Sequence, residues 1–199
     1  MYCILVTGIP AAGKSTMAKY LAGHFSIPVI SKDMIKELLL DNVGFKSREE
    51  KVKLGIASMN IMYYMAEQLM KLNQPFILEN NFEYSSKDGL DEILDKYSYK
   101  AITLTLTGNY EKIYERFVER NESVDRHRGH VVNDRYPELE VGRKIPPIPF
   151  ESLIAGIKNR GMDSFVSNGP HIVVDTTDFE NVDLDSIVNE IRNYQEKFV

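Results

Sequence analysis

The chain has 199 residues, of which 43% are hydrophobic and 27% are charged. This composition is typical of a folded globular protein and excludes the disordered and fibrous classes. The net charge of −5 argues against a surface dedicated to duplex nucleic acid, because such a surface needs clustered lysine and arginine. The length fits a single α/β domain.

The sequence carries one cysteine and no long apolar run. Cys3 cannot form a disulfide within the chain, so a reducing compartment is expected. We find no signal-peptide pattern and no apolar stretch long enough to span a membrane. These features predict a cytoplasmic protein without a membrane partner.

The first predicted element is a strand over Ile4–Thr7, a mainly apolar run. It leads into Gly8–Ser15, which has the pattern GxxxxGKS of the Walker A phosphate-binding loop. Apolar residues then recur at helical spacing, which predicts a helix from about Lys14 to His24. This order of strand, loop and helix is the setting that the motif requires. The alternative is a glycine-containing turn with a solvated lysine.

Each residue type in this loop has a physical role. Gly8 and Gly13 allow backbone angles that a Cβ atom would block, so successive N–H groups can surround phosphate oxygens. The positive end of the next helix dipole points into the same nest. Lys14 is expected to reach the β- and γ-phosphates, and Ser15 to ligate Mg²⁺. The residues predicted to hold ATP are Gly8, Ile9, Pro10, Ala11, Ala12, Gly13, Lys14, Ser15 and Thr16.

A second strand is predicted over Ile27–Ile30, and a short helix follows it. Asp33 lies just after this strand, at the edge where open α/β sheets bind their ligands. A carboxylate there can orient an acceptor hydroxyl and accept its proton during phosphoryl transfer. The alternative is that Asp33 caps a helix that begins at Met34.

A long helix is predicted from about Arg48 to Leu72. Ser47 and Glu50 stand at the spacing of a capping box at its start. One face of this helix is rich in methionine, and we expect it to belong to the core rather than to a binding surface. That face consists of Met59, Met62, Tyr63, Ala66, Leu69 and Met70.

Three polar residues follow the third predicted strand, Pro75–Leu78. Glu79 ends this strand as a Walker B acid does, so it could hold Mg²⁺ through water or contact the acceptor. The alternative is a hydrogen-bonding role behind the metal. Asn80 and Asn81 are candidates for binding the substrate. After a further helix, alternating residues predict a fourth strand over Ala101–Leu106.

Asn109 is predicted to cap the next helix, and the chain becomes irregular from Asn121 to Pro149. Residues 126–144 carry a local net charge of +2 in an acidic chain. A long irregular segment of this kind is usually a lid or is disordered. Arg126 and Arg128 could cover a transferring phosphoryl group, whose charge spreads over its equatorial oxygens. The alternative is an ordinary solvated face.

The end of the chain is predicted to return to the core. A helix over about Phe150–Asn159, a fifth strand over His171–Val174 and a last amphipathic helix follow in turn. The alternation of five strands with helices predicts a mainly parallel sheet that is covered by helices on both faces. We therefore expect one domain over residues 1–199, with a lid segment at about 122–149.

Several sequence segments together resemble the small P-loop kinases related to polynucleotide kinase, zeta toxin and chloramphenicol phosphotransferase. They are GIPAAGKST, SKD, LEN, ERFVERN, RHRGH and IVVDTTD, and the resemblance covers nearly the whole chain. It implies a P-loop NTPase fold, a three-layer sandwich with strand order 2-3-1-4-5, together with ATP, Mg²⁺ and phosphorylation of a hydroxyl. By position it implies that Asp33 is the base. Lys36 falls where polynucleotide kinases bind a substrate phosphate, and Arg126 or Arg128 falls in the ATP lid.

These observations favour an ATP-dependent kinase whose acceptor is a hydroxyl of a small molecule or of a nucleic-acid end. The catalytic candidates are Lys14, Asp33, Arg126 and Arg128. The acceptor-binding candidates are Asp33, Lys36, Glu79, Asn80 and Asn81, and the candidate metal ligands are Ser15 and Glu79. The alternative is a nucleotide-binding switch or an ATPase without an acceptor, which predicts slow hydrolysis and no dependence on Asp33.

Overall fold

The computed structural model describes residues 1–140 and 142–198. Residue 141 of the predicted lid segment and residue 199 of the predicted domain lie outside the described residues. Five strands form one sheet in the order β2-β3-β1-β4-β5, and every pairing in it is parallel, so the expected strand order is confirmed. The strands are β1 (Tyr2–Gly8), β2 (Val29–Ser31), β3 (Ile77–Glu79), β4 (Lys100–Thr107) and β5 (His171–Asp175).

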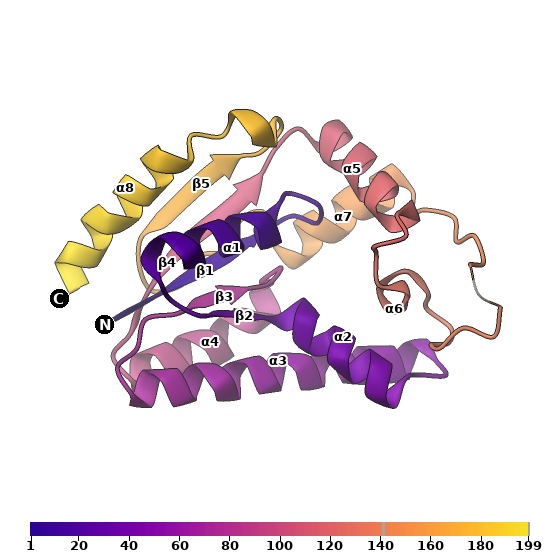
Figure 1. The fold of residues 1–199 in the computed structure, drawn as a ribbon, viewed down its shortest axis with the longest axis horizontal. Helices are drawn as coiled ribbons and strands as arrows, with labels where there is room; N and C mark the ends of the chain where they lie inside the picture. Colours follow the sequence, from indigo (N-terminus) through magenta and orange to yellow (C-terminus); the bar gives the residue numbers. More distant parts are fainter. Residues whose placement is uncertain (141, 199) are drawn as a thin grey trace.

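Helices connect the strands and cover both faces of the sheet (Figure 1). Before β4 these are α1 (Lys14–Phe25), α2 (Lys32–Val43), α3 (Arg48–Lys71) and α4 (Tyr84–Lys96). After β4 they are α5 (Tyr110–Glu122), α6 (Arg128–Val131), α7 (Phe150–Arg160) and α8 (Leu184–Gln195), with 3₁₀ turns η1 (Phe179–Asn181) and η2 (Glu196–Phe198). Within residues 1–140 and 142–198, no helix is long and apolar enough to cross a membrane.

The centre of the sheet is buried on both sides, as β1 shows. Its residues Ile4 and Val6 pack into a core that includes α1, α5, α7 and α8. Cys3 and Leu5, which alternate with them, pack into a second core with α3 and α4. All four side chains are fully buried. A strand that is covered on both faces has a continuous apolar sequence, and this run is the pattern that predicts β1.

The methionine-rich face of α3 is core along most of its length. Met62, Ala66 and Met70 are buried, which confirms the expectation for these residues. Met59 and Tyr63 lie at the N-terminal part of the same face, where they are partly buried and line a cavity. The face therefore serves packing at one end and a cavity wall at the other.

The 122–149 segment, which connects α5 to α7, is more ordered than expected. It contains the helix α6, whose cap His127 accepts a hydrogen bond from the Gly129 amide at 3.1 Å. An isolated antiparallel bridge joins Phe45, in the α2–α3 turn, to Tyr136. Figure 1 shows α6 at the side of the molecule opposite both termini, with the β1–α1 loop nearer the middle. Local capping and the bridge give the segment a structure that composition alone does not predict.

Candidate active site

The loop between β1 and α1 has the backbone that its glycines require. Gly8 has a φ of +120°, and a Cβ atom there would lie 2.0 Å from the Leu106 carbonyl oxygen. Gly13 has a φ of +85°, and its Cβ atom would lie 2.4 Å from the ring of Phe179. Ala11 also has a positive φ, 62°. These angles turn the loop over the start of α1, whose first amide groups have no partner within the helix, as a phosphate nest requires.

Lys14 is buried at the inner side of this loop. Its ammonium donates a hydrogen bond to the Ile9 carbonyl oxygen at 2.6 Å, and only 8% of the residue is exposed. Burial lowers the pKa of Lys14 to about 8, and the carboxylate of Glu79 partly opposes this shift. An anion in the loop would stabilise the charged form further, which is the property expected of a phosphate-binding lysine.

Ser15 and Glu79, the two predicted metal ligands, are in contact. The Ser15 hydroxyl donates a hydrogen bond to Glu79 Oε1 at 3.1 Å. The other carboxylate oxygen of Glu79 accepts a hydrogen bond from the Ser31 hydroxyl. Glu79 is 6% exposed, at the end of β3 and beside β1 in the sheet. The structure therefore places a buried carboxylate directly against the phosphate loop.

Asp33 lies in the first turn of α2 and does not cap it. Ser31 is the N-cap, and its hydroxyl accepts the Met34 amide at 3.4 Å, so the capping alternative for Asp33 is wrong. Half of the Asp33 side chain is exposed, and Oδ1 lies 3.7 Å from the Lys32 ammonium. Burial alone would raise the pKa of Asp33, but Lys32, Arg126 and their cationic neighbours outweigh it and hold the pKa below its usual value. The carboxylate is therefore ionised and available at neutral pH.

Two arginines are close enough to act on these acids. Burial and the charge of Arg126 lower the pKa of Arg120 to about 10, whereas Asp33 and Glu79 oppose the shift. Burial also lowers the pKa of Arg126. Within the described part of the chain, the Nε atom of each arginine is buried without a hydrogen-bond partner. Because an unpaired buried donor costs about 1–3 kcal/mol, a bound anion would relieve both.

Arg128, the other predicted catalytic arginine, does not join this group. Its Nε and Nη2 each lie 2.7 Å from a carboxylate oxygen of Glu138. Nη2 also donates to the Arg143 carbonyl oxygen at 2.8 Å. This bidentate pair uses the guanidinium inside the 122–149 segment. Arg120, rather than Arg128, accompanies Arg126 near the acids.

Polar contacts hold the 122–149 segment against α2 and α3. Lys51, which is 3% exposed, donates to the His130 carbonyl oxygen at 2.9 Å, to Asn133 Oδ1 at 3.1 Å and to the Val132 carbonyl oxygen. His130 Nε2 lies 2.8 Å from Glu37 Oε1 on α2. The segment therefore forms a wall beside α2 and α3.

A cavity of about 480 Å³ lies between α2, α3 and the start of α4. Lys36, Asn80 and Asn81, all predicted to bind the substrate, line it. Lys32, the neighbour of Asp33 in sequence, lines it as well. Burial and the charge of Lys32 lower the pKa of Lys36 to about 8. The structure thus gathers Lys36, Asn80 and Asn81 around one cavity, whereas Asp33 and Glu79 do not line it. Lys32, whose ammonium lies 3.7 Å from Asp33, connects the cavity to that carboxylate.

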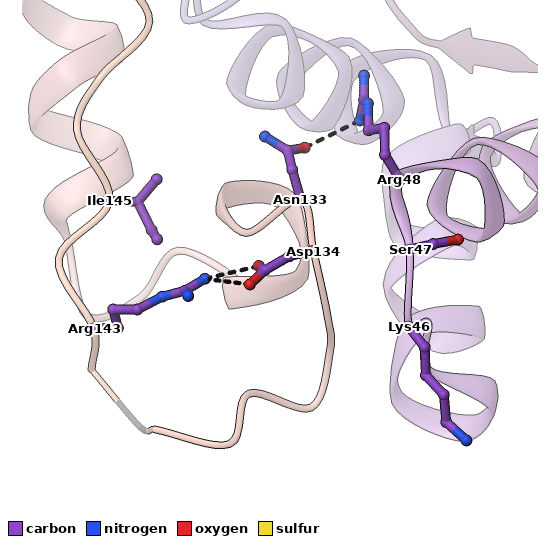
Figure 2. A pocket seen from close by; sticks show the side chains of 7 residues that line it. All are labelled: Lys46, Ser47, Arg48, Asn133, Asp134, Arg143 and Ile145. Carbon is purple, nitrogen blue, oxygen red and sulfur yellow. Dashed lines mark hydrogen bonds and ion pairs between the residues drawn. The ribbon is translucent and has the colours of Figure 1, made fainter.

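Figure 2 shows a different hollow, of about 560 Å³, between the start of α3 and the 122–149 segment. Its wall contains an ion pair in which Arg143 Nη2 lies 2.7 Å from Asp134 Oδ1. Lys46 points away from this pair. Neither hollow is lined by the phosphate loop or by Asp33. Lys36, Asn80 and Asn81 line the 480 Å³ cavity and not this one, so we place the candidate acceptor site at the 480 Å³ cavity.

Sequence reasoning misses three residues of this region, namely Arg48, Lys51 and Arg120. Lys51 carried a signal, because it stands at helical spacing with Ser58 and Met62 on the buried face of α3. A lysine on the buried face of a helix needs hydrogen-bond acceptors for its ammonium group. Arg120 lies within the ERFVERN segment but has no distinguishing position in the pattern.

Comparison with solved structures identifies the fold. A "putative kinase" from Chloroflexus aurantiacus J-10-fl has a TM-score of 0.78 and 26% identity, over 97% of each chain. A gluconokinase from Sinorhizobium meliloti 1021 has a TM-score of 0.53 and 16% identity, over 98% of this chain and 95% of that one. A shikimate kinase from Bacteroides thetaiotaomicron has a TM-score of 0.53 and 14% identity, over 98% of both chains. The fold is that of the P-loop kinases.

No curated protein matches the sequence. A family model, however, matches residues 4–139, which is more than half of the chain, and its description is AAA domain. The matched span runs from β1 through the phosphate loop, Asp33 and Glu79 into the 122–149 segment. The narrower resemblance to polynucleotide kinase and its relatives stays a prediction. The chain belongs to the AAA domain family.

Proposed function

We propose that this protein is an ATP-dependent kinase that transfers the γ-phosphoryl group to a hydroxyl of an acceptor held beside Asp33. The observation that carries the proposal is that Asp33 is ionised and free of any capping role, two residues after Ser31. The Ser31 hydroxyl shares the Glu79 carboxylate with Ser15 of the phosphate loop. A nucleotide switch needs the loop but no such carboxylate, whereas an ATPase would use it to orient water. The nearby cavity lined by amides and hydroxyls favours an organic acceptor over water. Two half-buried arginines, Arg120 and Arg126, whose buried Nε donors have no partner among the described residues, add the groups that phosphoryl transfer requires.

In the proposed reaction, Asp33 is the base. Its carboxylate accepts a hydrogen bond from the acceptor hydroxyl and takes its proton. The acceptor oxygen forms a bond to the γ-phosphorus as the bond from that phosphorus to the β–γ bridging oxygen breaks, and ADP leaves with the electron pair. Lys14 and the loop amides hold the phosphates, and Arg120 and Arg126 stabilise charge on the equatorial oxygens.

Ser15 and Glu79 fit a magnesium ion. Both present oxygen atoms, which Mg²⁺ prefers, and a site with few protein ligands leaves positions for water and phosphate oxygens. When bound, the ion would neutralise part of the phosphate charge. The hydrogen bond between Ser15 and Glu79 favours this role for Glu79 over direct contact with the acceptor.

The comparisons support a kinase in general. The Chloroflexus protein, at 26% identity, is described as a "putative kinase". A sugar kinase from Janibacter sp. HTCC2649 shares the fold, with a TM-score of 0.56 and 11% identity over 98% of this chain and 94% of that one. The resemblance to the polynucleotide kinase group adds a nucleic-acid end as a second acceptor class. We place a small molecule first, because the chain is acidic overall.

The test is ADP release from Mg–ATP in the presence of nucleosides, oligonucleotides with 5′-hydroxyl ends, sugars and hydroxylated antibiotics. An acceptor should stimulate release, Lys14→Ala should remove nearly all turnover, and Asp33→Asn should remove the stimulation while leaving ATP binding nearly unchanged. Asp185→Asn is the matched control, because Asp185 is the second residue of α8 as Asp33 is of α2. Stimulated release that survives Asp33→Asn would contradict the proposal.

A further inference from the structure

The cavity beside Asp33 has an excess of positive charge. Its cationic lining residues are Lys32, Lys36, Arg48 and Lys51. Among the described residues of the same wall, the single acid is Glu83. Glu83 is paired already, because its Oε1 lies 3.1 Å from Arg160 Nη1. Lys32 lies 3.7 Å from Asp33. The charges of the other three cations have no such counterpart in the wall.

Arg48 has donors to spare. Its Nη1 donates to Asn133 Oδ1 at 3.1 Å, a neutral acceptor (Figure 2). A guanidinium has five N–H donors in a planar fork, so this bond leaves several of them for a ligand. The Lys36 ammonium reaches from α2 to α3, where a Cβ atom at Gly55 would lie 3.7 Å from Nζ. Arg48 and Lys36 therefore present donors to the cavity from two helices.

Lys51 contributes positive charge to the cavity, but its N–H donors are already used. Its ammonium is used by the oxygen atoms of the 122–149 segment, all of them neutral. A second cavity, of about 280 Å³, shares Lys36, Arg48 and Lys51 with the first and adds Arg126. The shared cations thus stand between the acceptor cavity and the segment that carries Arg126.

The remaining lining is neutral and rich in hydrogen-bonding groups. It includes Asn60, Tyr63, Asn80, Asn81, Ser85 and Ser86. Amides and hydroxyls both donate and accept, so they suit the hydroxyl groups of a ligand. The volume of about 480 Å³ is that of a cavity for a small molecule rather than for a chain.

We propose that the phosphoryl acceptor is a small polyhydroxy compound that carries a phosphate or carboxylate group, with Arg48 and Lys36 as the ligands of that anion. This inference rests on the proposed function and names its substrate class. The anion would bind between α2 and α3, the hydroxyl groups would bind the amide-rich wall, and one hydroxyl would reach Asp33.

The protonation of the lysines agrees with this proposal. Burial, and then the charges of neighbouring cations, lower the pKa of Lys36 to about 8 and that of Lys51 to about 7. The lowered pKa values mean that the protonated lysines are destabilised in the free protein, and an anion that binds among them would stabilise the protonated forms. Binding of the acceptor should therefore take up protons near neutral pH.

The first experiment compares matched alcohols as acceptors in the ADP-release assay: glycerol, glycerol 3-phosphate and glycerate; ribose and ribose 5-phosphate; glucose, glucose 6-phosphate and gluconate. We expect a charged member to exceed its neutral partner in kcat/KM by at least about tenfold. Arg48→Met and Lys36→Met should each reduce this ratio about tenfold, and Arg48→Lys should restore part of it. Lys53→Met, an exposed lysine of α3 paired with Glu49, should leave the ratio unchanged.

The phosphate and carboxylate members of the glycerol and glucose series show which of the two anions the site binds. If charged and neutral acceptors are used equally well, the proposed function stands and the anion site is wrong. If each variant lowers both kcat/KM values equally, Arg48 and Lys36 are not its ligands.

The second experiment does not depend on turnover. A non-hydrolysable ATP analogue with Mg²⁺ first occupies the phosphate loop, and 10 mM inorganic phosphate is then added. We expect phosphate to raise Tm by about 3 °C in the wild type and the Lys53→Met variant, but not in Arg48→Met or Lys36→Met. No shift in the wild type, or equal shifts in all variants, would overturn the anion site. If no alcohol stimulates ADP release, the proposed function fails, and this shift decides the anion site alone.

Discussion

The Ser15 hydroxyl donates a hydrogen bond to Glu79 across 3.1 Å, which ties the phosphate loop to the end of β3. The same carboxylate accepts a hydrogen bond from Ser31, the N-cap of α2. One buried acid therefore connects the nucleotide side of the site with the helix that carries Asp33. The strand order β2-β3-β1 makes this possible, because the carboxyl ends of adjacent parallel strands meet at one edge of the sheet.

Glu79→Gln should weaken the response to magnesium. The substitution keeps the shape of the side chain but removes the charge that would hold the ion, so the Mg²⁺ concentration required for half-maximal turnover should rise about 10–100-fold. A Mg²⁺ titration of ADP release measures this. Glu49→Gln, at an exposed position of α3, is the control and should not change the midpoint. An unchanged midpoint together with lost acceptor stimulation would assign Glu79 to the acceptor instead.

Gly13→Ala should damage the phosphate loop, whereas Gly23→Ala should not. Gly13 has a φ of +85° and its Cβ atom would meet Phe179, so alanine should cost about 1–3 kcal/mol of stability and lower ATP affinity. Gly23 lies in the same helix region with no atom within 4 Å of its Cβ position. Alanine there should stabilise the protein by about 0.5–1 kcal/mol. Urea unfolding measures the stability of the two variants, and ATP titration measures their affinity for ATP. Equal stability changes would contradict both the strained backbone at Gly13 and its close contact with Phe179.

The sequence predicts the centre of the sheet well because β1 and β3 are buried on both faces. Runs such as that of β1 have no polar alternation, and each leads into turn or site residues, so strands and helices separate clearly. The bounds of the short strands are less well predicted: β2 begins at Val29 rather than Ile27, and β3 at Ile77 rather than Pro75. Pairing with neighbouring strands, which no local pattern contains, sets these ends.

The site is predicted less completely than the fold, because its charges depend on contacts distant in sequence. The sequence allows Asp33 either catalysis or capping, and only the structure shows that Ser31 is the N-cap of α2. Arg126 and Arg128 look alike in sequence, but Glu138 binds Arg128. Arg120 approaches the acids because of how α5 packs, which no spacing within ERFVERN reveals.

The affinity for ATP should fall as the pH rises above about 8. Burial lowers the pKa of Lys14 to about 8 in the free protein, and bound phosphates would raise it. Between these two pKa values the complex holds a proton that the free protein has lost, so binding takes up a proton and weakens with rising pH. Calorimetry at pH 8.5 in two buffers of different ionisation enthalpy measures this uptake. Lys19→Ala, on the exposed side of α1, should not alter it, and the absence of uptake would contradict the role of Lys14.

Acid should destabilise the protein through His130. This side chain is 9% exposed and bound to Glu37, and burial lowers its pKa to about 3, against about 6.5 in an unfolded chain. Between these values the unfolded state binds the additional proton, so the free energy of unfolding decreases as the pH falls from 6.5. Burial raises the pKa of Glu37, which acts in the opposite sense and only below neutral pH. In urea unfolding, the free energy of unfolding should therefore decrease less between pH 7 and pH 4 for His130→Gln than for the wild type. His24→Gln, at an exposed position of α1, should behave as the wild type does. Equal decreases in all three proteins would show that the contact between α2 and the 122–149 segment does not depend on a neutral His130.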